Sequence, residues 1–249
     1  MNNSVYISDC TLVTLSGFDP DTFLESHHIV NNIITKPSAL KGLTPKIDNS
    51  TALAVSAVVK LNEKLKKPIN KEKTGILIGS KTGNHQIAYN YANRVRKGSS
   101  SPAMYSVSGY NMSAGLSALA TKLNGPTMVL SGEKMNIADC ILISSNYIYR
   151  NDADNMMVGQ VDINNKGDWG SAIFFRISNK REAQSIKIDI NVKADPSSKK
   201  SISSSVDSIP IQISSYLNEA YDLYNYFYSA EKKDKFIKSL NKVIIKLSK

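Results

Sequence analysis

The stretch that decides the fold runs from Ser101 to Asp162. It reads SPAMYSVSGYNMSAGLSALATKLNGP, then TMVLSGEKMNIADCILISSNYIYRN, then DADNMMVGQVD. Two of its segments, 112–123 and 137–147, are apolar on nearly every side of a predicted helix. Such helices are typical of a large core, so the sequence predicts that this stretch lies at the centre of the molecule.

Short strands and tight turns separate the two helices. Residues 127–130 follow the turn at Gly125-Pro126 and predict a short strand, and residues 155–161 predict a buried strand. We expect a loop over 101–111 before the first helix. A sharp turn at Gly132-Glu133-Lys134 should precede the second.

The rest of the chain continues this alternation. Asn49 or Ser50 is the expected cap of the next helix upstream. Residues 185–192 alternate in polarity as a strand at the edge of a sheet would. The predicted elements outside the central stretch are a short helix near 19–26, helices at 51–67 and 86–96 and strands at 5–15, 74–80, 171–177 and 185–192. This order predicts an α/β layered fold with a mostly parallel sheet.

Composition narrows the class of protein. Hydrophobic content is 41% and charged content 21%, which is ordinary for a globular chain. The sequence has no apolar run long enough for a membrane span and no secretory signal at its N-terminus, so we expect a cytoplasmic protein without an integral membrane segment. The two cysteines, Cys10 and Cys140, have no metal-ligand spacing and are expected to be buried, so no metal or other cofactor is predicted.

The net charge of +10 raises the question of an acidic partner. Residues 231–249 contain seven lysines and two acids, whereas the central stretch is close to neutral. No stripe of arginine and aromatic residues suited to nucleic acid is present, so nucleic acid is not expected as a partner. Two interpretations stay open, solvated lysine faces and a surface for an acidic protein.

The C-terminal part of the chain is predicted as a separate unit. We expect a main domain over 1–193, a serine-rich linker over 194–210 and a helical basic tail over 211–249. The second helix of that tail would be amphipathic, with six apolar residues on one face: Phe236, Ile237, Leu240, Val243, Ile244 and Leu247. Such a helix could bind a membrane surface or an acidic partner, or pack on its own domain.

Several segments, in this order, resemble the N-terminal half of the β-ketoacyl synthases, which have a thiolase-like fold. The matching segments are GILIGSKTG (75–83), Ser101-Pro102 with Asn111 and Ala114-Gly115, Gly125-Pro126, MMVGQVD (156–162) and Asp168 to Ala172. The resemblance covers roughly residues 5–178. It implies a thiolase-like layered fold, N-terminal half only, with a mostly parallel mixed sheet packed with helices, followed by a helical tail.

The chain departs from that family where the chemistry resides. Counting from Gly125-Pro126, the position of the family's nucleophilic cysteine is occupied by Lys134, preceded by Glu133. Cys140 lies about one and a half helical turns further on, so it cannot occupy the exposed turn. The two catalytic histidines of the family belong to a C-terminal half for which residues 194–249 are too short. Thiolate catalysis therefore lacks both its nucleophile and its electrophilic partners.

A ketosynthase homologue without the cysteine resembles a chain-length factor, in particular the half-size kind of aryl polyene-type biosynthetic clusters. The resemblance implies a heterodimer with a full-length, active ketosynthase that elongates fatty acyl, polyene or polyketide chains on an acyl carrier protein. Family dimers pair through the strand before the nucleophile turn, here Thr127, Met128, Val129 and Leu130. Candidates for lining the partner's acyl tunnel are Tyr105, Gly109, Tyr110 and Met112, with plain core and loop roles as the alternative.

Other interpretations of the turn stay open. Lys134 could pair with Glu133 or the partner as a relic, contact an acidic partner or carrier protein, or act as an amine that forms a Schiff base. An enzymatic alternative is a malonyl-carrier decarboxylase or acyltransferase using Glu133 and Lys134. A further alternative is a basic adaptor whose tail binds acyl carrier protein or membrane.

Overall fold

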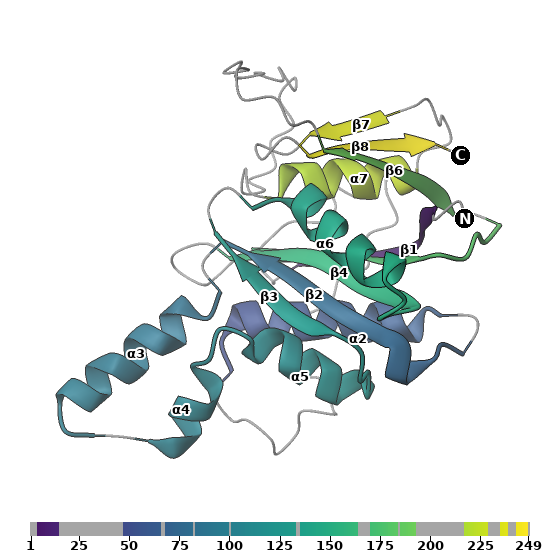
Figure 1. Ribbon diagram of the computed structural model, residues 1–249. Helices are drawn as coiled ribbons and strands as arrows, with labels where there is room; N and C mark the ends of the chain where they lie inside the picture. The colour runs from purple at the N-terminus through teal and green to yellow at the C-terminus, as the bar shows by residue number, and fades with distance from the viewer. Residues whose placement is uncertain are drawn as a thin grey trace.

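A single sheet organises the part of the chain that the structure describes (Figure 1). The structure is a computed structural model. It describes residues 4–14, 47–65, 68–81, 83–99, 101–132, 135–163, 170–183, 185–192, 217–228, 235–238 and 243–248. The expected helix near residues 19–26, the linker over 194–210 and the pair Glu133 and Lys134 lie outside these residues.

The sheet has eight strands in the order β3-β2-β4-β5-β1-β6-β8-β7. They are β1 (Val5–Thr14), β2 (Thr74–Ser80), β3 (Thr127–Ser131), β4 (Asn155–Ile163), β5 (Gly170–Ser178), β6 (Ile186–Val192), β7 (Lys235–Lys238) and β8 (Val243–Ser248). β2 pairs in parallel with β3 and β4, and the other pairings are antiparallel. Among the five strands from β3 to β1, only β5 runs against the rest. The predicted mixed, mostly parallel sheet is therefore confirmed.

Helices cover both faces of the sheet and make three layers (Figure 1). The helices are α2 (Asn49–Glu63), α3 (His85–Arg96), α4 (Pro102–Val107), α5 (Met112–Thr121), α6 (Ile137–Tyr149) and α7 (Asn218–Tyr228). α2 and α5 pack on one face, with Phe174 of β5, and α6 and α7 pack on the other, with Phe175. Because successive side chains of a strand point to opposite faces, the nearly continuous apolar run of β5 supplies both cores.

The helices differ from the sequence prediction most clearly in α2 and α4. The cap of α2 is Asp48, whose side chain accepts a 2.7 Å hydrogen bond from the Thr51 N–H, rather than Asn49 or Ser50. The same helix ends at Glu63, short of the predicted Lys67. The expected loop over 101–111 contains α4, which begins because the Ser101 side chain accepts from the Met104 N–H and Pro102 occupies the first helical position.

The tail departs most from its prediction. α7 confirms a helix there, but the second predicted helix is wrong, since residues 235–238 and 243–248 are strands. β8 pairs antiparallel with β6, so β6 is not the edge strand that its alternation suggested. β-Branched residues such as Val243 and Ile244 favour strands wherever a neighbouring strand can pair with them, and the open side of β6 supplies that neighbour.

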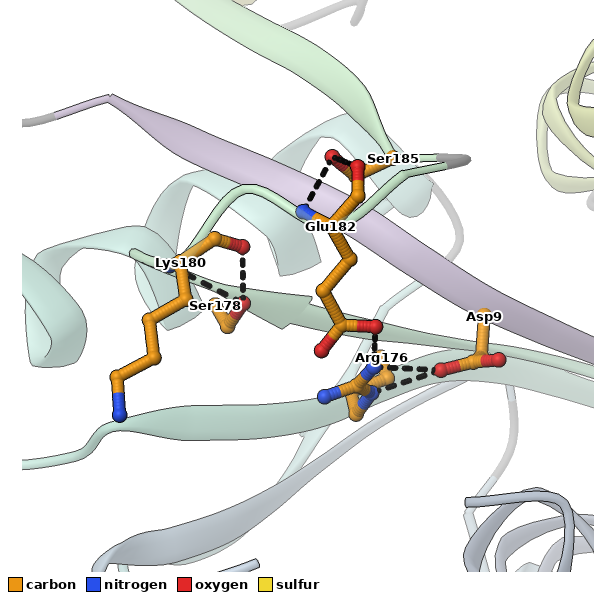
Figure 2. A network of polar contacts seen from close by, with 6 residues as sticks. All are labelled: Asp9, Arg176, Ser178, Lys180, Glu182 and Ser185. Carbon is orange, nitrogen blue, oxygen red and sulfur yellow. Dashed lines mark hydrogen bonds and ion pairs between the residues drawn. The ribbon is translucent and has the colours of Figure 1, made fainter. Parts of the chain in front are cut away.

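A charged network joins β5, β1 and the connection to β6 (Figure 2). The buried Arg176 guanidinium lies 2.7 Å from the Asp9 carboxylate and 2.8 Å from that of Glu182. Ser185 holds the connection in place, because its hydroxyl accepts from the Glu182 N–H and donates to the Glu182 carbonyl. Partial burial raises the pKa of Asp9 although Arg176 lowers it, so this contact stabilises the fold mainly by giving the buried Arg176 guanidinium its partners.

None of the helices in the described ranges is long and apolar enough to cross a membrane.

Candidate functional site

The turn between β3 and α6 is the position where the resemblance would place a nucleophile. Gly132 donates to the Ser80 carbonyl at 3.4 Å, and Met135 donates back to the Gly132 carbonyl at 3.2 Å. Asn136 then begins α6 with a capping box, in which its side chain accepts from the N–H groups of Ala138 and Asp139. The described ends of the turn are therefore fixed by backbone hydrogen bonds and a helix cap.

Cys140 lies behind this turn and points away from it. Its side chain is 0% exposed, and a Cβ built on Gly79 would come within 2.8 Å of its sulfur, so the thiol packs against β2. Burial raises the pKa of the Cys140 thiol, which keeps it protonated. As the sequence predicted, this cysteine is buried and inert. Cys10 is buried too.

A carboxylate that the sequence analysis missed lies beside the cap of α6. Glu219 comes from the first turn of α7, and its pKa is raised to about 7 by burial and by the charge of Asp139. The nearby Asn136 side-chain amide lowers that pKa in part. Nothing in the local sequence connects residues 219 and 139, because only the docking of the tail on α6 brings them together.

β3 is the edge of the sheet next to this turn. Thr127 and Ser131 at its ends are exposed, and the three apolar residues between them are half-buried. Met128 and Leu130 pack toward the α6 side, and Val129 packs toward the α2 side. The four predicted dimer-strand residues thus lie on a short, incompletely covered edge strand.

The four tunnel candidates belong to the segment that leads from α4 into α5. Tyr105 is 67% exposed on α4, where its ring lies 5.7 Å from that of Tyr91. Tyr110 is 56% exposed, and Gly109 beside it is exposed as well. Met112 differs, since it packs partly buried against the small cluster around Val55 and Leu116.

Two asparagines fix this segment, and neither of these roles was predicted from the sequence. Buried Asn84, only 2% exposed, donates to the carbonyls of Val107 and Gly109, and its own oxygen accepts from the Thr51 hydroxyl. Asn111 accepts a 3.3 Å hydrogen bond from the Val129 N–H of β3. A signal for Asn84 was present, since it directly follows the glycine turn that ends a buried strand.

Tyr110 connects the segment to the turn after β2. A Cβ built on Gly83 would lie 2.9 Å from the Tyr110 ring and 3.8 Å from the Ser131 hydroxyl. Gly83 has φ +54°, a conformation that favours glycine. Tyr110 and Ser131, the last residue of β3, thus both lie close to Gly83, whereas Tyr105 lies out on α4.

Comparison with known proteins identifies the fold. No protein-family model matches the sequence, and no curated protein matches it. Among solved structures, it is similar to a chain of a ketosynthase in complex with its chain length factor from Xenorhabdus doucetiae, with a TM-score of 0.58 and 12% identity over 99% of both chains. The chain has the thiolase-like fold of ketosynthases and chain length factors.

Two further structures share this fold. The ishigamide ketosynthase/chain length factor matches with a TM-score of 0.53 and 16% identity, over 73% of this chain and 55% of that one. A complex of a type II polyketide acyl-carrier protein with its ketosynthase matches with a TM-score of 0.56 and 12% identity, over 78% and 70% of the two chains. The present chain thus spans about half the length of the ishigamide chain.

Proposed function

We propose that this chain is a non-catalytic, chain-length-factor-like subunit. It pairs with a full-length β-ketoacyl synthase, and the pair elongates acyl chains carried by an acyl carrier protein, as in aryl polyene, polyketide or fatty acid biosynthesis. The observation that carries the proposal is a ketosynthase-like fold whose nucleophile turn contains no cysteine. Cys140 cannot substitute, because it is buried behind β2 with its pKa raised.

The partner interface of this proposal is β3. An edge strand has unpaired backbone groups along one side, and a strand of another chain can pair with them. The half-buried Met128, Val129 and Leu130 offer apolar surface beside those groups. In the β-ketoacyl synthases, the family that this chain resembles, dimers form through the equivalent strand. This supports β3 as the contact with the ketosynthase.

The acyl carrier protein is the second proposed partner, and its support is electrostatic. Residues 74–132 contain no aspartate or glutamate. Their cations are Lys81, Arg94, Arg96, Lys97 and Lys122, all exposed and, within the described part of the chain, outside any ion pair. Exposed cations without ion-pair partners among the described residues fit an acidic partner such as a carrier protein.

Tyr110 is the tunnel candidate that the structure favours. It lies against Gly83, which is also close to Ser131 at the end of the proposed interface strand, whereas Tyr105 lies out on α4. We expect Tyr110 to contact the partner near the growing acyl chain. Exchange of Tyr110 for alanine should then alter product length more than the same exchange at Tyr89, an exposed tyrosine of α3.

Co-expression with the ketosynthases of its own host tests the proposal. The tagged chain should retain a full-length, cysteine-bearing ketosynthase in stoichiometric amount, as mass determination would show. Leu130→Lys on β3 should abolish retention of the ketosynthase. The matched variant Leu119→Lys, at an exposed position of α5, should not. A folded, monodisperse chain that retains no ketosynthase would overturn the proposal.

The alternatives make different predictions. A decarboxylase or acyltransferase using Glu133 and Lys134 would turn over malonyl-carrier protein alone and lose this activity in Lys134→Ala. The adaptor alternative has lost the amphipathic helix it required, because residues 235–238 and 243–248 are strands. The cytoplasm is the compartment we propose, in agreement with two buried cysteines that are not joined in a disulfide.

A further inference from the structure

The outer side of β3 is not entirely open. β3 pairs with β2 through the Ile76 N–H, which donates to the Pro126 carbonyl, and the register sets Ile76 opposite Thr127. In a parallel ladder, the N–H groups of Met128 and Leu130 then face β2, and those of Thr127, Val129 and Ser131 face outward. The central outward donor, Val129, is the one that Asn111 occupies.

Asn111 forms this contact instead of a local one. It is the N-cap residue of α5, a position where asparagine side chains commonly accept from the first turn of the helix. The Asn111 side chain makes no such cap bond and reaches the edge strand instead. Two sets of N–H groups thus compete for one amide oxygen, the edge donor of β3 and the first turn of α5.

The segment around Asn111 is held independently of this contact. Asn84 binds the carbonyls of Val107 and Gly109 from the buried side, and Thr51 fixes Asn84 in turn. The Asn111 side chain can therefore leave Val129 and turn to the first N–H groups of α5 without unfolding the segment.

The position of Val129 makes its N–H important for the pairing of β3 with another strand. β3 has five residues, and Val129 is its centre. If two copies of β3 paired antiparallel about a two-fold axis, the outward Val129 N–H of each would donate to Val129 of the other. A side chain bound to that N–H blocks the middle hydrogen bonds of this arrangement.

We infer that Asn111 is an edge guard, which keeps β3 from pairing with a second copy until a strand of the partner ketosynthase displaces it. This inference rests on the proposed function for the identity of the partner strand. On displacement, a carbonyl of the partner accepts from the Val129 N–H, and the Asn111 side chain caps α5. Displacement of Asn111 replaces one hydrogen bond of the Val129 N–H by another, so it gains little free energy by itself. A partner that makes further contacts can therefore displace Asn111, whereas a weak contact with a second copy of this chain cannot.

The test uses the isolated full-length chain and analytical ultracentrifugation. Asn111→Ala should self-associate at least tenfold more strongly than the wild type, because its edge strand is open. Adding Val129→Pro should remove the gain, since proline lacks the N–H and is tolerated where the N–H faces outward. The matched control Thr127→Ala, which removes a hydroxyl on the same strand that bonds the Gly125 carbonyl, should behave as the wild type.

Amide hydrogen exchange gives a second measurement that needs no variant. In the wild-type monomer the Val129 amide should exchange at least tenfold more slowly than the Thr127 amide, which also faces outward. Equal exchange rates, or Asn111→Ala sedimenting as the wild type does, would overturn the inference. Because neither measurement includes a ketosynthase, their failure is distinct from failure to capture one.

Discussion

The two edges of the sheet are finished in different ways. At one edge the chain adds its own strands, since β8 pairs with β6 and β7 pairs with β8, while α7 packs on the α6 face. At the other edge β3 is short, half-buried and occupied by one asparagine side chain. The first edge is extended by the tail and ends at β7, whereas the second ends at β3, the strand that we propose pairs with another chain.

This difference separates stability from binding. Residues such as Leu223 and Tyr224 of α7 are buried within the larger core, so the tail contributes to folding. The residues of β3 bury less, so substitutions there should change association more than stability. Four substitutions test this contrast, in order of decreasing expected effect on the free energy of unfolding.

Tyr224→Ala should have the largest effect. Tyr224 is the largest fully buried side chain, and truncating a buried aromatic residue costs about 4 kcal/mol. Urea unfolding followed by circular dichroism measures the loss. The control Tyr149→Ala, on the partly exposed end of α6, should cost less than about 1 kcal/mol. Equal losses for the two variants would mean that α7 is not part of the core.

Arg176→Met should follow. The change leaves the carboxylates of Asp9 and Glu182 near each other without their cation (Figure 2). We expect a loss of about 2 kcal/mol, below that of a wholly buried pair because both acids are partly exposed. Thermal unfolding at neutral pH measures this loss. The control is Arg150→Met, because Arg150 belongs to a more exposed ion pair with Asp152. A loss no larger than that of Arg150→Met would contradict the prediction.

Glu219→Gln should stabilise the chain by an amount that increases with pH. The folded-state pKa of Glu219 is about 7, above its ordinary 4.5, so the native state binds the proton more tightly than the unfolded state. Its favourable contribution is complete below pH 4.5 and is lost as the pH rises through 7. Glutamine keeps the neutral form at every pH.

The gain should therefore be near zero at pH 4 and about 1 kcal/mol at pH 8, reduced from the full linkage value because Glu219 is only half-buried. Urea unfolding of both proteins at the two pH values measures it. A constant difference across this range would show that Glu219 does not titrate near the α6 cap.

Thr127→Lys should have the smallest effect on stability, below about 0.5 kcal/mol, because Thr127 is exposed at the β3 edge. A lysine there should nevertheless prevent strand pairing, so capture of the ketosynthase should fall sharply. The matched control is Lys122→Arg, because Lys122 is already an exposed cation next to this strand. If the Thr127→Lys variant still captured the ketosynthase fully, the interface would not lie at this edge.

The amino-acid sequence by itself determined the central architecture. Apolar runs such as those of β2, β4 and β5 predict strands buried on both faces, and the nearly all-apolar α6 predicts a helix inside a large core. The buried state of Cys140 followed from its place inside that helix. These features depend on local composition, which a single sequence displays directly.

The tertiary structure decided what depends on distant neighbours. Residues 236–247 carry a helical pattern, but residues 235–238 and 243–248 are strands, because β8 pairs with β6 and β7 pairs with β8. The pairing of β8 also turns the supposed edge strand β6 into an inner one. The meeting of Glu219 with Asp139, and of Asn111 with Val129, likewise needs segments brought together by folding. Hydrogen bonds and desolvation act over a few ångströms in space, whereas a sequence pattern records only spacing along the chain.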